Sequence, residues 1–151
     1  MISPGMRGKP ISQAEKPVVP SDLGQATHPR ILLVDDENDV RALNADVLIR
    51  SGYHVDTAEN GAIAWKALQT NSYDLLITDN TMPEMTGLEL IRQVRSADMT
   101  LSVILASGTV PAEELSRSPW LHVNALLPKP YSIGSLLRTV AEVLRKADLS
   151  P

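Results

Sequence analysis

The stretch ILLVDDE, residues 31–37, decides the fold class of this chain. Its first four residues form an apolar run unbroken by polar residues, as in a strand buried on both faces of a sheet. Two adjacent carboxylates, Asp35 and Asp36, follow at once. Three later runs have the same form, and Tyr53–Ala58 is a fifth, more mixed candidate. The three runs are Leu75–Ile77, Val103–Ala106 and Ala125–Leu127. The sequence therefore predicts five strands.

Segments with a helical spacing of apolar residues separate these strands. Their apolar stripes are Val40, Leu43, Val47 and Leu48; then Ile63, Ala64, Ala67 and Leu68; then Leu88, Ile91 and Val94; and finally Leu136, Leu137, Val140, Val143 and Leu144. Thr86 and Glu89 have capping-box spacing at the start of the third helix. The fourth helix, over Pro111–Ser116, is expected to be short because Ser118-Pro119 disfavours its continuation. Five strand–helix units predict an α/β fold, with helices on both faces of a doubly wound parallel sheet.

Composition limits the classes of protein to which this chain can belong. It has 151 residues, 43% of them hydrophobic, which suits one core and no second ordinary domain. The net charge of −4 argues against non-specific binding to nucleic acid or to an anionic membrane. The absence of cysteine excludes disulfides, thiolate metal sites and cysteine nucleophiles. No apolar stretch resembles a membrane span or a signal peptide, so we expect a soluble, cytoplasmic protein.

Residues 1–29 differ from the rest of the chain. They hold five of the eleven prolines and three of the eight glycines, and they show no apolar period. This segment is predicted to be a flexible, Pro-rich N-terminal tail, with a partner-binding arm around Val18-Val19-Pro20 as the alternative. Its three basic and two acidic residues leave −5 for residues 30–151. We expect the ordered domain to cover residues 30–147, followed by a short C-terminal tail over 148–151.

The four unbroken runs each end in residues capable of chemistry. The first ends in Asp35 and Asp36, the second is followed by Thr78 and then Asp79, the third by Ser107, and the fourth by Pro128 and then Lys129. Ligands of open α/β sheets bind beyond the carboxyl ends of the strands, so the fold would gather these groups into one crevice. Each residue taken alone could be a helix cap, a turn residue or a solvated charge. Tyr53–Ala58 supplies no such group, which suits an edge strand.

Three carboxylates in one crevice repel one another, by about 4 kcal/mol for each pair at ~4 Å and an effective dielectric near 20. Either one carboxyl group stays protonated or a hard divalent cation binds. All-oxygen ligation with few protein donors suits Mg²⁺, which prefers phosphate as a co-ligand. An ammonium and a hydroxyl beside such an ion make a site for a phosphoryl group. A carboxylate there can itself be the nucleophile and form an aspartyl phosphate.

Other motifs add little chemistry. The chain has neither GxxxxGK nor GxGxxG, which argues against nucleoside triphosphatases and dinucleotide enzymes. His28, His54 and His122 show no ligand spacing and are interpreted as surface or turn residues. Trp120 is expected to pack in the core or as a lid, with a role in recognition as the alternative.

Four pieces of sequence match one family in order and spacing. They are LLVDDE at 32–37, DNTMPEMTG at 79–87, SG at 107–108 and LPKPY at 127–131. The chain from about Arg30 to Lys146 thereby resembles the receiver domain of two-component response regulators, which includes the bacterial chemotaxis regulator. The resemblance implies a flavodoxin-like sheet with strand order 2-1-3-4-5 and five helices. It also implies a place in a phosphorelay.

The resemblance implies roles for the residues at the strand ends. Asp79 would accept a phosphoryl group from a phosphohistidine on a sensor histidine kinase or a histidine phosphotransfer protein. Asp35 and Asp36 would position Mg²⁺ together with Asp79, with Asp36 the more direct ligand and the backbone carbonyl of Thr81 a further one. Lys129 would pair with the phosphoryl oxygens.

The resemblance also implies a switch and limits the chemistry. Ser107 would swing in to hydrogen-bond the phosphoryl group and bias the loop and short helix that follow. Only self-phosphorylation and self-dephosphorylation are expected, not turnover of an external substrate. The Lys129-Pro130 bond is similar to one that is commonly cis in this family. Leu126 stands where the family usually has an aromatic residue, so we expect output to run through residues 108–118 to a downstream protein target.

Alternatives to this hypothesis remain open at this point. A phosphatase of the haloacid dehalogenase type would also use Asp79 as its nucleophile, although Thr81 stands where its second acid belongs. A binding module with a vestigial site is a third possibility. The chain could be a stand-alone regulator, a phosphotransfer intermediate or a receiver excised from a hybrid kinase, and a monomer or a weak dimer through its last helix. No nucleic-acid partner and no membrane insertion are expected.

Overall fold

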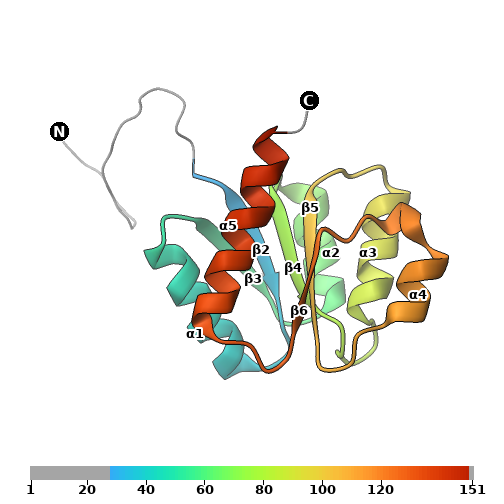
Figure 1. Cartoon of the computed structure of the whole chain (residues 1–151), viewed down its shortest axis with the longest axis horizontal. Coiled ribbons are helices and arrows are strands. Elements are labelled where there is room, and N and C mark those ends of the chain that lie inside the picture. Colours follow the sequence, from blue (N-terminus) through green and yellow to red (C-terminus); the bar gives the residue numbers. More distant parts are fainter. Residues whose placement is uncertain (1–27, 150–151) are drawn as a thin grey trace.

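The structure is a computed structural model that describes residues 28–149 (Figure 1). The predicted N-terminal tail therefore lies outside the described residues, apart from His28 and Pro29. The last helix continues to Leu149, two residues beyond the predicted end of the domain at 147. Within residues 28–149, no helix is long and apolar enough to cross a membrane.

Five parallel strands form one sheet in the order β3-β2-β4-β5-β6. The strands are β2 (Arg30–Val34), β3 (His54–Ala58), β4 (Leu75–Asp79), β5 (Ser102–Ser107) and β6 (Ala125–Pro128). Counted along the chain, this is the predicted order 2-1-3-4-5. The mixed strand β3 lies at an edge, as expected, and the fully buried β4 and β5 lie inside the sheet. The chain reverses its direction of travel across the sheet after β3, so the ends of β2 and β4 flank the switch point.

Helices cover both faces of the sheet (Figure 1). α1 (Asn38–Arg50) and α5 (Ile133–Leu149) cover one face and pack with the buried cluster that contains Ile31 and Leu33. The other face carries α2 (Gly61–Thr70), α3 (Gly87–Ser96), α4 (Ala112–Arg117) and the 3-10 helix η1 (Pro119–Leu121). The largest fully buried side chains are all leucine or isoleucine, so the core of this phenylalanine-free chain is aliphatic.

The predicted capping box at the start of α3 is confirmed, and local signals also mark the ends of other helices. The hydroxyl of Thr86 accepts a hydrogen bond from the Glu89 amide, and the Glu89 carboxylate accepts one from the Thr86 amide, which completes the capping box. Asn60 caps α2 by accepting from the Ile63 amide. Gly52 follows the end of α1 at φ +101°, a conformation that glycine adopts without strain. α4 is short as expected, although Pro111 precedes it instead of lying in its first turn.

Two positions of the predicted helical stripes are wrong. Leu43 is 53% exposed and Ile63 is 44% exposed. The buried positions of α1 are Asn44 and Leu48, and those of α2 are Gly61, Ala64 and Leu68. The faces of α1 and α2 that pack against the sheet are narrower than their predicted apolar stripes. Leu43 and Ile63 therefore point toward solvent.

The predicted core packing of Trp120 is also wrong, because its side chain is 48% exposed. The next residue, Leu121, is fully buried in its place. The guanidinium of Arg95 on α3 holds this turn by donating hydrogen bonds to the carbonyl oxygens of Leu121 and His122, at 2.8 and 2.9 Å. It also donates to the carbonyls of Met99 and Leu101, at 2.9 and 2.8 Å. This register points Leu121 inward and leaves Trp120 at the surface.

Candidate functional site

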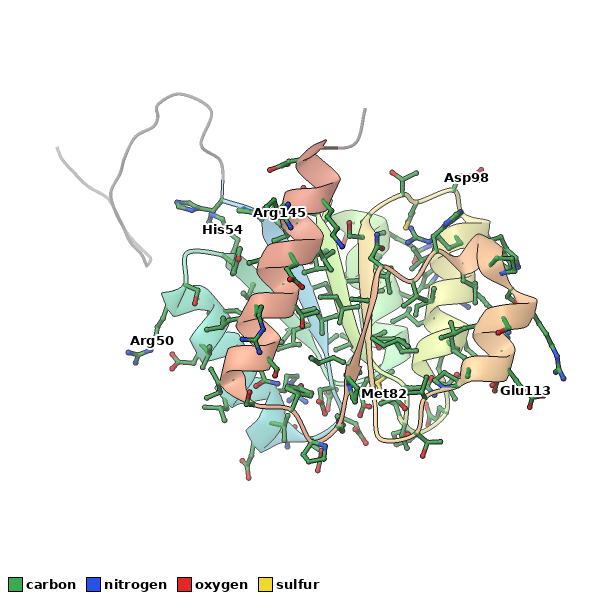
Figure 2. The ribbon with its side chains drawn as sticks, in the orientation of Figure 1. Arg50, His54, Met82, Asp98, Glu113 and Arg145 are labelled. Atoms are coloured by element: carbon green, nitrogen blue, oxygen red, sulfur yellow. The ribbon has the colours of Figure 1, made fainter. Side chains whose placement is uncertain are left out.

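The carboxyl ends of four strands bring the predicted site residues to one edge of the sheet. Asp35 follows β2, Asp79 ends β4, Ser107 ends β5 and Lys129 follows β6. Figure 2 labels Met82, just after β4, at this end of the molecule, and His54 and Asp98 at the opposite end. The parallel register makes this edge continuous, with Asp79 beside Ala106 and Ser107 beside Pro128.

The three predicted carboxylates form one cluster. Asp35, Asp36 and Asp79 each offer an oxygen atom, and these atoms lie within 4.8 Å of one another. Asp35 and Asp79 are 3% and 5% exposed, whereas Asp36 is exposed. Among the described residues this is the one group of potential metal ligands, and no histidine joins it. An all-oxygen set that crowds negative charge fits a hard divalent cation, so the cluster could bind a metal.

The ammonium of Lys129 lies between the carboxylates. Its Nζ is 3.2 Å from Asp79 Oδ2 and 3.7 Å from Asp35 Oδ2. A third carboxylate, that of the exposed Glu37, lies 3.9 Å away. The backbone amide of Lys129 donates to the Ser107 carbonyl at 2.9 Å, and the Lys129-Pro130 bond is cis, as the resemblance implied. The backbone of Lys129 is thus hydrogen-bonded to β5, while its side chain extends to the carboxylates at the ends of β4 and β2.

Charge and burial shift the titration of this cluster. Burial raises the pKa of Asp79, the hydrogen bond and charge of Lys129 lower it, and the charge of Asp35 raises it, with a net increase. Burial acts to lower the pKa of Lys129, but Asp35 and Asp79 together outweigh that effect and raise it. Asp79 is therefore held in a site that penalises its negative charge while the neighbouring ammonium stays protonated.

The hydroxyl of Ser107 does not contact the carboxylates in this structure. It donates to the carbonyl oxygen of Thr109 and accepts from the Thr109 amide at 3.2 Å. Ser107 itself is only 3% exposed. The strand thus brings Ser107 to the expected edge, but its side chain is engaged with the loop that leads to α4.

The backbone behind Asp79 is closely packed. The Asn80 side-chain oxygen accepts from the Leu88 amide at 3.1 Å, and the Asn80 carbonyl accepts from the Gly87 amide at 3.0 Å. A Cβ atom on Gly87 would overlap the Asp79 carbonyl oxygen and lie 3.0 Å from the Asn80 Cα. Glycine is therefore required at this position, and it brings the start of α3 directly against the turn that carries Asp79.

Sequence reasoning missed two features of the site. Glu37 ends the LLVDDE motif and has no predicted role, yet its carboxylate lies 3.9 Å from the Lys129 ammonium. The buried Asn44 donates to the hydroxyl of Tyr131 at 2.8 Å, next to the Lys129-Pro130 bond. Asn44 lies four residues from both Val40 and Leu48. A polar residue on an apolar stripe was the signal that could have drawn attention to it.

Comparison with known proteins agrees with this geometry. The family model described as response regulator receiver domain matches residues 31–141. The response regulator receiver protein CpdR of Brucella abortus is 35% identical over 115 residues, which cover 76% of this chain and 96% of CpdR. The sensor histidine kinase RcsC of Salmonella typhi is 35% identical over 111 residues, which cover 74% of this chain and 12% of the kinase.

A solved structure shares the fold. The response regulator protein TrrA of Thermotoga maritima, in complex with Mg²⁺-BeF, is 33% identical with a TM-score of 0.67, and the match covers 76% of this chain and 98% of TrrA. These comparisons give no support to the phosphatase alternative. The match to the family model over most of the described residues, with the four strand ends assembled as above, shows that the chain belongs to the family of response regulator receiver domains and has the receiver function in two-component signalling.

Proposed function

We propose that Asp79 is the phosphoacceptor of this receiver. The observation that carries the proposal is the position of the Lys129 ammonium, 3.2 Å from the buried Asp79 carboxylate at the edge where four strands end. A carboxylate oxygen of Asp79 would attack the phosphorus of a phosphohistidine. The P–N bond would break, its electron pair would go to the imidazole, and the imidazole would take a proton from solvent.

The neighbouring residues support this transfer. Asp35, Asp36 and Asp79, with the backbone carbonyl of Thr81, would hold Mg²⁺, and Asp36 would be the more direct ligand. The ion supplies positive charge to the phosphoryl oxygens while it is bound. Lys129 would leave its ion pair with the Asp79 carboxylate to pair with the new phosphoryl oxygens. Before the transfer, the carboxylates of Asp35 and Asp79 outweigh the effect of burial and raise the pKa of Lys129.

Ser107 would carry the signal outward. Its hydroxyl would exchange the Thr109 carbonyl for a phosphoryl oxygen, which would release the loop that begins at Gly108. α4 has no buried residue and no side-chain cap, so it is free to follow this loop. The altered surface over residues 108–118 would then meet a downstream protein.

Receiver domains partner with sensor histidine kinases, and such kinases are among the relatives of this chain. We therefore propose a sensor histidine kinase or a histidine phosphotransfer protein as the phosphoryl donor, in the cytoplasm. The receiver would occupy residues 30–147 and extend with α5 to Leu149. Apart from self-phosphorylation and loss of its own phosphoryl group, we expect no catalytic turnover.

The test is a mass measurement after incubation with Mg²⁺ and phosphoramidate, a small donor with a P–N bond. The wild type should gain one phosphoryl group, and Asp79→Asn should gain none. Asp98→Asn is the matched control, because Asp98 lies at the opposite end of the sheet and has φ +60°, which asparagine tolerates. An unmodified wild type, or equal gain by Asp79→Asn, would refute the assignment.

A further inference from the structure

α1 buries a polar side chain on the face that packs toward α5. Asn44 is only 4% exposed, and its Nδ2 donates to the hydroxyl of Tyr131 at 2.8 Å. The two residues are 87 positions apart in sequence. A buried amide without a hydrogen-bond partner destabilises the folded protein. The hydrogen bond to Tyr131 therefore favours the arrangement in which α1 and Tyr131 are in contact.

Tyr131 belongs to the segment that carries Lys129. The Lys129 amide is fixed to the Ser107 carbonyl of β5, and the Ser132 hydroxyl accepts from the Ser135 amide in the first turn of α5. Between these two points the ring of Tyr131 packs against the cluster under α1 and α5. The segment from Lys129 to Ser132 is thus anchored to β5, to α5 and, through one hydrogen bond, to α1.

The outer side of this segment is not filled. A cavity of about 430 Å³ lies between it and α1, lined by Lys129, Pro130, Tyr131 and Ile133 on one side and by Glu37, Val40, Leu43 and Asn44 on the other. On this side, therefore, side-chain packing does not fill the space between the segment and α1. Asn44 and Tyr131 both line this cavity, and within the described residues their hydrogen bond is the one that joins α1 to the segment.

We propose that Asn44 and Tyr131 form a positioning pair, which holds the Lys129 segment against α1 and so keeps the Lys129 ammonium at the phosphoacceptor. This inference rests on the proposed role of Asp79. The ammonium must move from the carboxylate to the incoming phosphoryl oxygens, and small misplacements of a charged group lower the rates of such steps strongly. Neither Asn44 nor Tyr131 touches Asp79, so the pair acts through Lys129.

The test separates positioning from stability with a double variant. Tyr131→Phe leaves the amide of Asn44 buried without its partner and should destabilise the protein. In Asn44→Leu/Tyr131→Phe both polar groups are replaced by apolar ones, a change that can be nearly neutral for stability. We expect the double variant to recover its melting temperature and yet to take a phosphoryl group from phosphoramidate about fivefold more slowly than the wild type, the size of one lost hydrogen bond.

The outcomes are distinct. A double variant that recovers both stability and the wild-type rate would show that the pair is only structural and would overturn the inference. A wild type that takes no phosphoryl group would overturn the proposed function instead. Tyr53→Phe is the control, because Tyr53 packs against the same cluster and its hydroxyl makes no hydrogen bond within the described residues. It should phosphorylate at the wild-type rate, and a fivefold loss there would also contradict the inference.

Discussion

The strands β4 and β5 lie side by side in the sheet, and each is followed by a helix on the same face, but α3 and α4 are held in different ways. α3 has a complete capping box and buries five residues, including Leu90 and Ile91. α4 has six residues, no side-chain cap and no buried residue. Asp79 thus stands before a helix that is locked to the core, and Ser107 before one that is loosely attached. The proposed switch would use both, because Asp79 would stay in place while the Ser107 hydroxyl moves.

The largest loss of stability should come from shortening a core-facing side chain, and it should be larger on α3 than on α4. Ile91 on α3 is fully buried, so Ile91→Ala should lower the free energy of unfolding by about 3 kcal/mol. Leu115 on α4 is only partly buried, and Leu115→Ala should cost about 1 kcal/mol. Urea unfolding of both variants measures the difference. Equal losses would mean that α4 is as firmly attached as α3.

The close approach of α3 to the Asp79 turn gives the next effect. Gly87→Ala should cost about 2 kcal/mol, because the new methyl group meets backbone atoms that cannot move aside. Gly134→Ala on α5 is the matched control. Its new Cβ would meet nothing closer than the Ser132 hydroxyl at 3.8 Å, so no loss is expected. If both substitutions are equally harmless, the packing of α3 against the Asp79 turn does not constrain this glycine.

The third prediction concerns the buried negative charge of Asp79, which lowers the stability of the folded protein. Without a divalent cation, Asp79→Asn should raise the free energy of unfolding by about 1 kcal/mol, because it removes a buried charge whose pKa is raised. The raised pKa means that the folded wild type binds a proton at a higher pH than the unfolded chain does. The advantage of the variant should therefore be full at neutral pH and shrink as the pH falls through the raised pKa.

This advantage should vanish below 3.8, the ordinary pKa of the group. Chemical unfolding across that pH range, in a chelating buffer, measures it. Added Mg²⁺ should stabilise the wild type more than the variant. A variant that is less stable than the wild type at neutral pH without metal would contradict the crowded-carboxylate picture.

The smallest effect concerns the cap itself. Thr86→Ala removes the side-chain half of the capping box and should cost slightly less than 1 kcal/mol. Thr100→Ala is the comparison, since the Thr100 side chain is exposed and makes no hydrogen bond within residues 28–149. Thermal unfolding distinguishes the two. Identical melting temperatures would show that the capping box does not contribute to the firm attachment of α3.

Much of the site, and of the difference between α3 and α4, could be predicted from the sequence. Buried parallel strands show as unbroken apolar runs, and the rule that parallel strands end at one edge places Asp35, Asp79 and Lys129 together without any knowledge of distances. The spacing of Thr86 and Glu89 predicted the capped start of α3, and Ser118-Pro119 predicted that α4 is short. These signals are local, or they follow from strand direction alone.

What the sequence could not show depends on register between elements. Trp120 and Leu121 are adjacent large apolar residues, and only the 3-10 turn held by Arg95 decides which of them enters the core. The exposure of Leu43 and the burial of Asn44 likewise depend on how α1 is rotated against α5 and the Tyr131 segment. Helical spacing alone does not distinguish these positions. Contacts with residues from distant parts of the chain determine which of them are buried.

The guanidinium of Arg95 gives the connection between β5 and β6 one fixed end. Its four hydrogen bonds to carbonyl oxygens join the approach to β5 with the turn at Leu121 and His122. A displacement of α4 that keeps these bonds leaves the turn at Leu121 and His122 in place. Under the proposed switch, a movement of Ser107 would act on the opposite end of this connection, while the turn at Leu121 and His122 stays in place. Lysine cannot replace this arginine, since a single ammonium cannot reach four carbonyls that lie in different directions.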